Sequence, residues 1–155
     1  MACGKSTIGA KLAESLGFPF IDTDQQIERN EGISISHIFA EQGEGHFRKR
    51  EKEVIASIIQ QYENVVVSTG GGLPCSDESI AALLNDGTVI YLECDTRTLF
   101  KRIAIQSAER PLAPSSEQEL SLHLSPRLKY YARAHHIIDG SKDVENIVRQ
   151  ITDVL

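Results

Sequence analysis

The stretch Gly4-Lys5-Ser6-Thr7 decides the fold, because it stands directly before a segment with helical periodicity. These four residues match the end of the phosphate-binding loop G-x-x-x-x-G-K-[ST]. Glycine lets the backbone curl around phosphate oxygens, lysine reaches the transferred group, and the serine hydroxyl can bind Mg²⁺. The helix N-terminus adds partial positive charge, and the threonine can reach an inner phosphate. The stretch therefore predicts a nucleotide site on a βα turn.

Short apolar runs alternate with amphipathic segments along the rest of the chain. Each run is too short for a helix, and the last three are rich in β-branched residues. The predicted strands are Phe18–Ile21, Val65–Ser68, Thr88–Leu92 and His136–Ile138. Apolar residues at helical spacing fall between and after them: Ile8, Leu12 and Leu16; Phe47, Val54, Ile55, Ile58 and Ile59; Leu99, Phe100 and Ile103; Val144, Ile147, Val148, Ile151 and Val154. The alternation predicts an α/β fold, with a parallel sheet covered by helices on both faces.

Length and composition argue against several classes of protein. The 155 residues suit one domain, 1–155, and a net charge of -6 argues against nucleic-acid or anionic-membrane binding. No apolar run approaches the ~20 residues of a membrane span, and no signal peptide is evident. Three cysteines without metal-type spacing argue against a disulfide scaffold or a zinc site. We expect a cytoplasmic protein.

Two carboxylates follow the first predicted strand. Asp22 and Asp24 alternate by two, so an extended chain would point both to one side, at the sheet edge where ligands bind. One can hold Mg²⁺, directly or through water, and the other can accept a hydrogen bond from a substrate hydroxyl and act as base. The alternative is a solvated strand end with a helix cap.

Two further motifs suggest binding of an oxygen-rich acceptor. Arg48 and Glu51 are three apart, so they share a helix face; either they form a surface ion pair, or Glu51 orients Arg48 toward a substrate carboxylate. Gly70, Gly71 and Gly72 follow the next strand. Three glycines exceed what a simple turn needs, which suggests close approach of the backbone to a ligand.

The segment Ser107–Ser125 holds two prolines and few large apolar residues, which is typical of an exposed loop or a lid. A capping box of Ser116 and Glu119 can start a short helix inside it, and Pro126 suits the start of a new helix. Arg110 opens this segment and can swing onto the phosphates. Arg127, four residues before Tyr131, can grip an acceptor carboxylate.

Taken together, these motifs resemble those of shikimate kinases, within the nucleoside monophosphate kinase-like P-loop proteins. The resemblance covers essentially the whole chain and rests on G-K-S-T, D-T-D at Asp22–Asp24, F-R-x-x-E at Phe47–Glu51, G-G-G at Gly70–Gly72, R-P-L at Arg110–Leu112 and R-x-x-x-Y at Arg127–Tyr131. It implies a three-layer P-loop sandwich with a five-stranded parallel sheet in the order 2-3-1-4-5 and a mobile lid at about 108–125. The implied reaction transfers the γ-phosphate of ATP to the 3-hydroxyl of shikimate, with Mg²⁺, in the pathway to chorismate.

The resemblance also implies a role for individual residues. Lys5, Asp24 and Arg110 are the implied catalytic residues, with Asp24 positioning or deprotonating the attacking hydroxyl. Ser6 and Asp22 would hold the metal. ATP would bind to Gly4, Lys5, Ser6, Thr7, Arg102 and Arg110, with the turn 139–141 near the adenine. Shikimate would bind to Asp24, Arg48, Gly70, Gly71, Gly72 and Arg127, with both arginines on its carboxylate.

The chain departs from the family pattern at its start. The first loop glycine would lie before Met1, and the strand that normally feeds the loop is also absent, so we expect a strand of about ten residues to be missing. This strand is central in the family order, so we expect the chain as given to be poorly active or unstable. Alternatives are a gluconate kinase-like or nucleotide kinase-like enzyme, or an inactive nucleotide-binding remnant. We expect a monomer.

Overall fold

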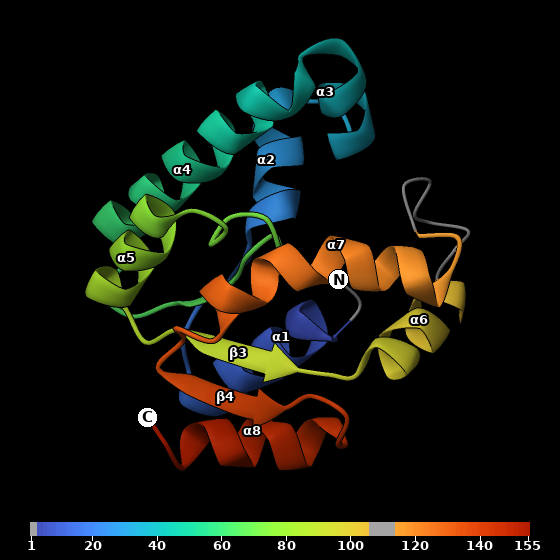
Figure 1. Ribbon diagram of the computed structural model, residues 1–155. Coiled ribbons are helices and arrows are strands. Elements are labelled where there is room, and N and C mark those ends of the chain that lie inside the picture. The colour runs from blue at the N-terminus through green and yellow to red at the C-terminus, as the bar shows by residue number, and fades with distance from the viewer. Residues whose placement is uncertain (1–2, 106–113) are drawn as a thin grey trace.

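The computed structural model describes residues 3–105 and 114–155 (Figure 1). Four short strands form where the apolar runs predict them: β1 (Phe20–Asp22), β2 (Val66–Ser68), β3 (Ile90–Glu93) and β4 (His136–Asp139). The predicted starts of β1 and β3 are two residues too early, and the ends of β1, β3 and β4 lie one residue later than predicted.

The strands pair in parallel, as the alternation of strands and helices predicts. β1 pairs with β2, with Phe20 opposite Val66, and β3 pairs with β4, with Ile90 opposite His136. Within the described residues these are two separate two-stranded sheets. The predicted α/β class with parallel strands is confirmed.

Eight helices are described, and side-chain caps set the start of several of them. The serines before α3, α5 and α7 and the aspartates before α2 and α8 accept hydrogen bonds from first-turn amides. The helices are α1 (Lys5–Leu16), α2 (Thr23–Glu31), α3 (Ile35–Glu41), α4 (Gly43–Gln61), α5 (Asp77–Asp86), α6 (Thr96–Ile105), α7 (Glu117–Tyr131) and α8 (Val144–Thr152).

The apolar residues gather in two core clusters. The larger cluster joins α1, α6, α7 and α8 around β3 and β4, and includes Ile8, Leu12, Leu99 and Ile147. The smaller cluster lies among α2, α3 and α4, which project together away from β3 and β4 (Figure 1). The carboxyl ends of β1 and β2 lead into the region between these two clusters, and this is where the predicted site residues lie.

Helix α7 differs from its prediction. We expected a new helix to begin at Pro126, but α7 runs continuously from Glu117 to Tyr131 with Pro126 inside it. Leu120 and Leu124 are buried before the proline, and Tyr131 packs on the same cluster after it, so tertiary packing holds both halves in one helix. The predicted Ser116 cap is confirmed, since its hydroxyl accepts from the Glu119 amide at 3.1 Å.

Residues 106–113, which include Arg110 and the rest of its R-P-L motif, lie outside the described residues. Of the predicted lid, only 114–125 is described, and most of it belongs to α7. In the part of the chain that the structure describes, no helix combines the length and apolarity needed to cross a bilayer.

Candidate active site

The phosphate loop begins at a glycine with a left-handed backbone. Gly4 has a φ of 90°, and a side chain there would also meet Ile8 Cδ1 at 3.3 Å. This conformation lets the chain turn directly into α1, whose first-turn amides have no partner within the helix. Ser6 and Thr7 are exposed at this end. The predicted nucleotide-binding residues thus form a helix N-terminus suited to phosphate oxygens.

The two predicted metal ligands are in direct contact. The Ser6 hydroxyl donates to Asp22 Oδ2 at 2.6 Å. The other carboxylate oxygen of Asp22 caps α2, accepting from the Asp24 amide at 3.1 Å and the Gln25 amide at 3.4 Å. Asp22 is therefore both a helix cap, as the alternative interpretation holds, and a partner of the phosphate loop.

Asp24 lies in the first turn of α2, not on an extended chain. The expectation that Asp22 and Asp24 alternate along a strand is therefore wrong: the Asp22 cap starts the helix at Thr23, immediately after β1. Asp24 Oδ1 is buried and has no hydrogen-bond partner among the described residues. Burial, followed by the charge of Asp22, raises the pKa of Asp24, while Lys5 opposes this shift. An unpaired buried carboxylate oxygen close to Lys5 is a candidate base.

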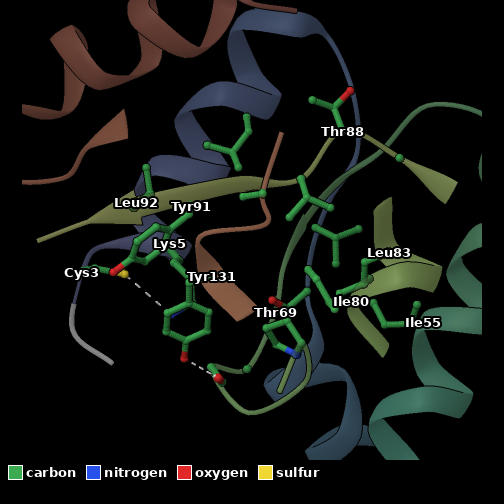
Figure 2. A pocket seen from close by; sticks show the side chains of 18 of the residues that line it. Cys3, Lys5, Ile55, Thr69, Ile80, Leu83, Thr88, Tyr91, Leu92 and Tyr131 are labelled. Atoms are coloured by element: carbon green, nitrogen blue, oxygen red, sulfur yellow. Dashed lines mark hydrogen bonds between the residues drawn. The ribbon is translucent and has the colours of Figure 1, made fainter. Parts of the chain in front are cut away.

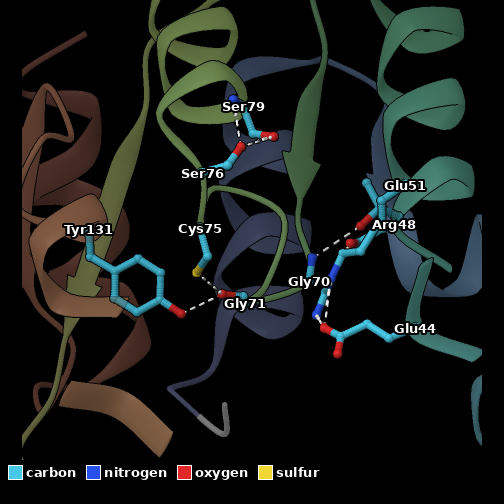
Figure 3. Close-up of polar contacts among 10 residues, drawn as sticks. Glu44, Arg48, Glu51, Gly70, Gly71, Cys75, Ser76, Ser79 and Tyr131 are labelled. Carbon is cyan, nitrogen blue, oxygen red and sulfur yellow. Dashed lines mark hydrogen bonds and ion pairs between the residues drawn. The ribbon is translucent and has the colours of Figure 1, made fainter. Parts of the chain in front are cut away.

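Arg48 is held between two carboxylates (Figure 3). Its Nη1 donates to Glu51 Oε2 at 2.5 Å and its Nη2 donates to Glu44 Oε1 at 2.8 Å. Glu51 is fully buried, so this is not the surface ion pair of the alternative interpretation. Burial raises the pKa of Glu51, and the hydrogen bond from Arg48 opposes that rise. Glu51 therefore orients Arg48, as the spacing predicts.

The glycine run lies against these charged side chains. A Cβ on Gly70 would lie 2.6 Å from Glu51 Oε1 and 2.8 Å from Asp24 Oδ1, and a Cβ on Gly72 would overlap the Arg48 guanidinium. The absence of side chains here lets the protein's own carboxylates and arginine approach the backbone closely, and the expected approach to a ligand stays a prediction. The glycines thereby bring Asp24, Glu51 and Arg48 to one backbone segment.

Tyr131 fixes the other side of the glycine run. Its hydroxyl donates to the Gly71 carbonyl at 2.5 Å, and the Cys75 thiol donates to the same oxygen at 3.3 Å (Figure 3). Burial raises the pKa of Tyr131 to about 12, so the hydroxyl keeps its proton. Arg127, one turn earlier on α7, lies close enough to lower the pKa of both Tyr131 and Cys75. Arg48 from α4 thus contacts the glycine run, and Arg127 from α7 lies near the two side chains that bond the Gly71 carbonyl.

One cavity connects the phosphate loop with the glycine run (Figure 2). Its volume is about 280 Å³, and its wall includes Lys5, Gly70, Gly71 and Tyr131. Residues from α1, from the turn after β2 and from α7 therefore meet in one place. A phosphate donor at α1 and an acceptor at the glycine run would be neighbours.

Arg102 joins the start of the phosphate loop to the turn that follows β4. Its Nη1 donates to the Gly140 carbonyl at 3.1 Å and to the Cys3 carbonyl at 3.5 Å. In the predicted turn 139–141, the Ser141 hydroxyl donates to Asp139 Oδ1 at 2.6 Å. The structure thus brings together the arginine and the turn that were expected near the adenine.

The sequence interpretation missed three contributors. Thr23 is fully buried and accepts from the Gly70 amide at 3.1 Å, so it ties α2 to the glycine run. Glu44 is the second partner of Arg48, and its i,i+4 spacing was a usable signal. Cys75 contacts the Gly71 carbonyl, and nothing in the sequence indicates that contact.

Known proteins are similar to this chain in sequence and in structure. A family profile for shikimate kinase matches residues 1–155. The shikimate kinase of Persephonella marina is 42% identical over 152 residues, covering 97% of this chain and 92% of the relative. The shikimate kinase of Acinetobacter baumannii, solved in complex with shikimate, is 32% identical with a TM-score of 0.90, covering 99% of this chain and 87% of that one.

A gluconokinase of Sinorhizobium meliloti is more distant, with 18% identity and a TM-score of 0.58 over 97% of this chain and 83% of that one, so it shares the fold alone. The match to the profile spans the phosphate loop, both flanking arginines and the glycine run. The chain belongs to the shikimate kinase family.

Proposed function

We propose that the chain transfers the γ-phosphate of ATP to the 3-hydroxyl of shikimate, in the pathway to chorismate and the aromatic amino acids. The observation that carries this proposal is Arg48, which the buried Glu51 holds against Gly72 beside Asp24. A planar guanidinium suits a carboxylate, and a nearby carboxylate base suits a hydroxyl. Shikimate carries both groups on one ring.

The donor side would be formed by the start of α1. Gly4, Lys5, Ser6 and Thr7 would bind the ATP phosphates through backbone amides, the ammonium group and the hydroxyls. Arg102 would bind near the adenine, beside the Gly140 carbonyl that it contacts. For Arg110, which lies outside the described residues, we propose the transfer role that the resemblance implies.

Ser6 and Asp22 fit a magnesium ion. Both present hard oxygen atoms, which already lie 2.6 Å apart. No group of three or more His, Cys, Asp or Glu side chains is arranged for a metal in residues 3–105 or 114–155. Mg²⁺ binds proteins through one or two side-chain groups plus phosphates and water, and Ser6 and Asp22 would supply two such groups. When bound, the ion would neutralise charge on the phosphates.

On the acceptor side, Arg48 and Arg127 would bind the shikimate carboxylate from two helices. Gly70, Gly71 and Gly72 would line the backbone wall between them. Asp24 would accept a hydrogen bond from the attacking hydroxyl and take its proton as the phosphoryl group transfers. Phosphoryl transfer depends mainly on alignment and charge neutralisation, which these fixed groups supply.

We infer that the protein works as a monomer in the cytoplasm. Cys3, Cys75 and Cys94 are free thiols, which suits a reducing compartment.

An acceptor panel tests the proposed function. ADP release is measured with ATP, Mg²⁺ and either shikimate, gluconate or a nucleoside monophosphate. We expect release that depends on shikimate and exceeds release with the other acceptors by at least about 100-fold, because shikimate holds its carboxylate and hydroxyl on one rigid ring, whereas gluconate is an open chain and a nucleoside monophosphate lacks the carboxylate. Preference for gluconate or a nucleotide would contradict the proposal, and ATP binding without acceptor-dependent release would indicate a nucleotide-binding module.

Tyr131→Phe should weaken the acceptor side selectively. It removes the hydroxyl that holds the Gly71 carbonyl, so we expect the KM for shikimate to rise about threefold to tenfold while the KM for ATP stays constant. Steady-state kinetics measure both constants. Tyr130→Phe, at the preceding position of the same helix, is the matched control. Equal effects of the two variants would show that the Gly71 contact does not position the acceptor.

A further inference from the structure

A buried hydrogen bond joins the start of α2 to the glycine run. The Gly70 amide donates to Thr23 Oγ1 at 3.1 Å, across 47 positions of the chain. Thr23 is fully buried and is the first residue of α2. Its neighbours in the chain are Asp22 and Asp24, so the bond forms between the proposed metal ligand and the proposed base. A buried backbone amide needs a partner, and Thr23 supplies it here.

Two carboxylate oxygens without partners also lie beside Gly70. A Cβ on Gly70 would stand 2.8 Å from Asp24 Oδ1 and 2.6 Å from Glu51 Oε1. Both oxygens are buried, and neither has a hydrogen-bond partner among the described residues. Figure 3 shows Glu51 next to Gly70. The Gly70 amide thus has three acceptors close by, and it bonds the uncharged one.

This choice of acceptor leaves the Asp24 carboxylate free. A carboxylate accepts a stronger hydrogen bond than a hydroxyl does, so a Gly70 amide released from Thr23 would turn to a carboxylate oxygen. Glu51 already accepts from Arg48 at its other oxygen, which offsets its charge, so Asp24 is the stronger competitor. A bond from Gly70 to Asp24 Oδ1 would occupy the oxygen that is now unpaired.

We propose that Thr23 is a positioning residue, whose hydroxyl accepts the Gly70 amide and thereby keeps Asp24 Oδ1 unpaired for the acceptor hydroxyl. The inference rests on the proposed function, in which Asp24 takes the proton of that hydroxyl. Thr23 acts through Gly70 and Asp24 rather than on the substrate, because its own side chain is fully buried. The hydroxyl carries the role, so serine should replace threonine here and valine should not.

Steady-state kinetics with ATP and shikimate test this role. Thr23→Val keeps the shape of the side chain and removes the hydroxyl. We expect kcat to fall about 10–100-fold while the KM for shikimate changes by less than about threefold, because the substitution affects the base and leaves the arginines in place. Thr23→Ser keeps the hydroxyl, so its kcat should stay within about threefold of that of the unsubstituted chain.

Thr152→Val is the matched control. It removes a threonine hydroxyl that donates to the Val148 carbonyl at 3.0 Å in α8, outside the site, and it should change neither constant. An unchanged kcat for Thr23→Val, or equal losses for Thr23→Val and Thr23→Ser, would overturn the proposal.

A double-variant cycle separates an effect through Asp24 from a general structural effect. Asp24→Asn removes the base, so adding Thr23→Val to it should lower the remaining kcat by less than about twofold. If the two substitutions acted independently, their fold-losses would multiply, and the proposal would be wrong.

Hydrogen exchange covers the case in which Thr23→Val does not fold. Because the Gly70 amide donates to Thr23, Asp24→Asn should leave the exchange rate of this amide within about threefold of its rate in the unsubstituted chain. A rise of about tenfold or more would mean that Asp24 holds the amide, which contradicts the proposal.

A crystal structure of Thr23→Val without ligands gives a readout that does not depend on activity. We expect the Gly70 amide within hydrogen-bond distance of Asp24 Oδ1. An amide that bonds Glu51 or water instead, with Asp24 unmoved, would overturn the proposal. Failure of the proposed function would show in the unsubstituted chain, which would then release no ADP in response to shikimate, whatever the contacts of Gly70.

Discussion

Replacing Asp24 by asparagine should lower kcat with shikimate by about 10²–10⁴-fold, the range ascribed to a positioned general base. The Asp24 carboxylate has a buried oxygen without a partner, directly beside the glycine run and within the field of Lys5. An amide keeps the shape of the side chain but cannot take the proton of the attacking hydroxyl. Coupled measurement of ADP release at saturating shikimate and ATP gives the rate.

Thermal unfolding separates this catalytic effect from misfolding. Because the folded-state pKa of Asp24 is raised, the folded chain holds this proton more tightly than the unfolded chain. The associated stability is present below the ordinary aspartate pKa and is lost as the pH rises through the raised value. The amide of asparagine is uncharged at pH 7, so it keeps this stability. The Asp24→Asn variant should therefore have a melting temperature no lower than that of the unsubstituted chain.

Asp153→Asn, at the exposed end of α8, is the control for an aspartate outside the site. It should leave both the rate and the melting temperature unchanged. A near-normal turnover for Asp24→Asn would remove this residue from the proposed chemistry.

Replacing Arg48 by alanine should raise the KM for shikimate by about 10–100-fold while changing the KM for ATP by less than about twofold. Glu51 and Glu44 hold the guanidinium in place, so its orientation is fixed before the acceptor binds. Arg48→Lys should recover little of the loss, because an ammonium group cannot make the paired contacts of a guanidinium. Arg127→Ala should show the same selectivity for the acceptor.

The matched control for Arg48→Ala lies two residues along the same helix. Arg50 also pairs with two carboxylates, Glu31 and Glu53, but it is 40% exposed and lies away from the glycine run. Arg50→Ala should leave both KM values unchanged. If Arg48→Ala raised the two KM values equally, or if Arg48→Ala and Arg127→Ala both left shikimate affinity intact, the carboxylate assignment would be wrong.

The features that the sequence predicted correctly depend on local rules. The Arg48–Glu51 pair follows from i,i+3 spacing, and the phosphate loop follows from four adjacent residues before an amphipathic helix. The strands follow from short β-branched runs. Their exact limits depend on pairing: the Val66 amide bonds the Pro19 carbonyl, so the ladder with β2 begins later than the apolar run suggests.

The features that the sequence did not predict depend on contacts between distant segments. Tyr131 reaches Gly71 across 60 positions of the chain, and Thr23 reaches Gly70 across 47. Pro126 is tolerated within α7 because core residues hold the helix on both sides of it. Asp24 does not lie on the expected strand, because the Asp22 cap starts helix α2 at Thr23, one residue before Asp24. In each case tertiary packing or a cap outweighed the local pattern.

The most direct test of the central claim is a crystal structure of the chain with shikimate and ADP. The account predicts the shikimate carboxylate between the Arg48 and Arg127 guanidinium groups, its 3-hydroxyl within hydrogen-bond distance of Asp24, and the ADP phosphates at the start of α1 beside Lys5. Shikimate bound with its carboxylate away from both arginines, or with no hydroxyl in reach of Asp24, would contradict it.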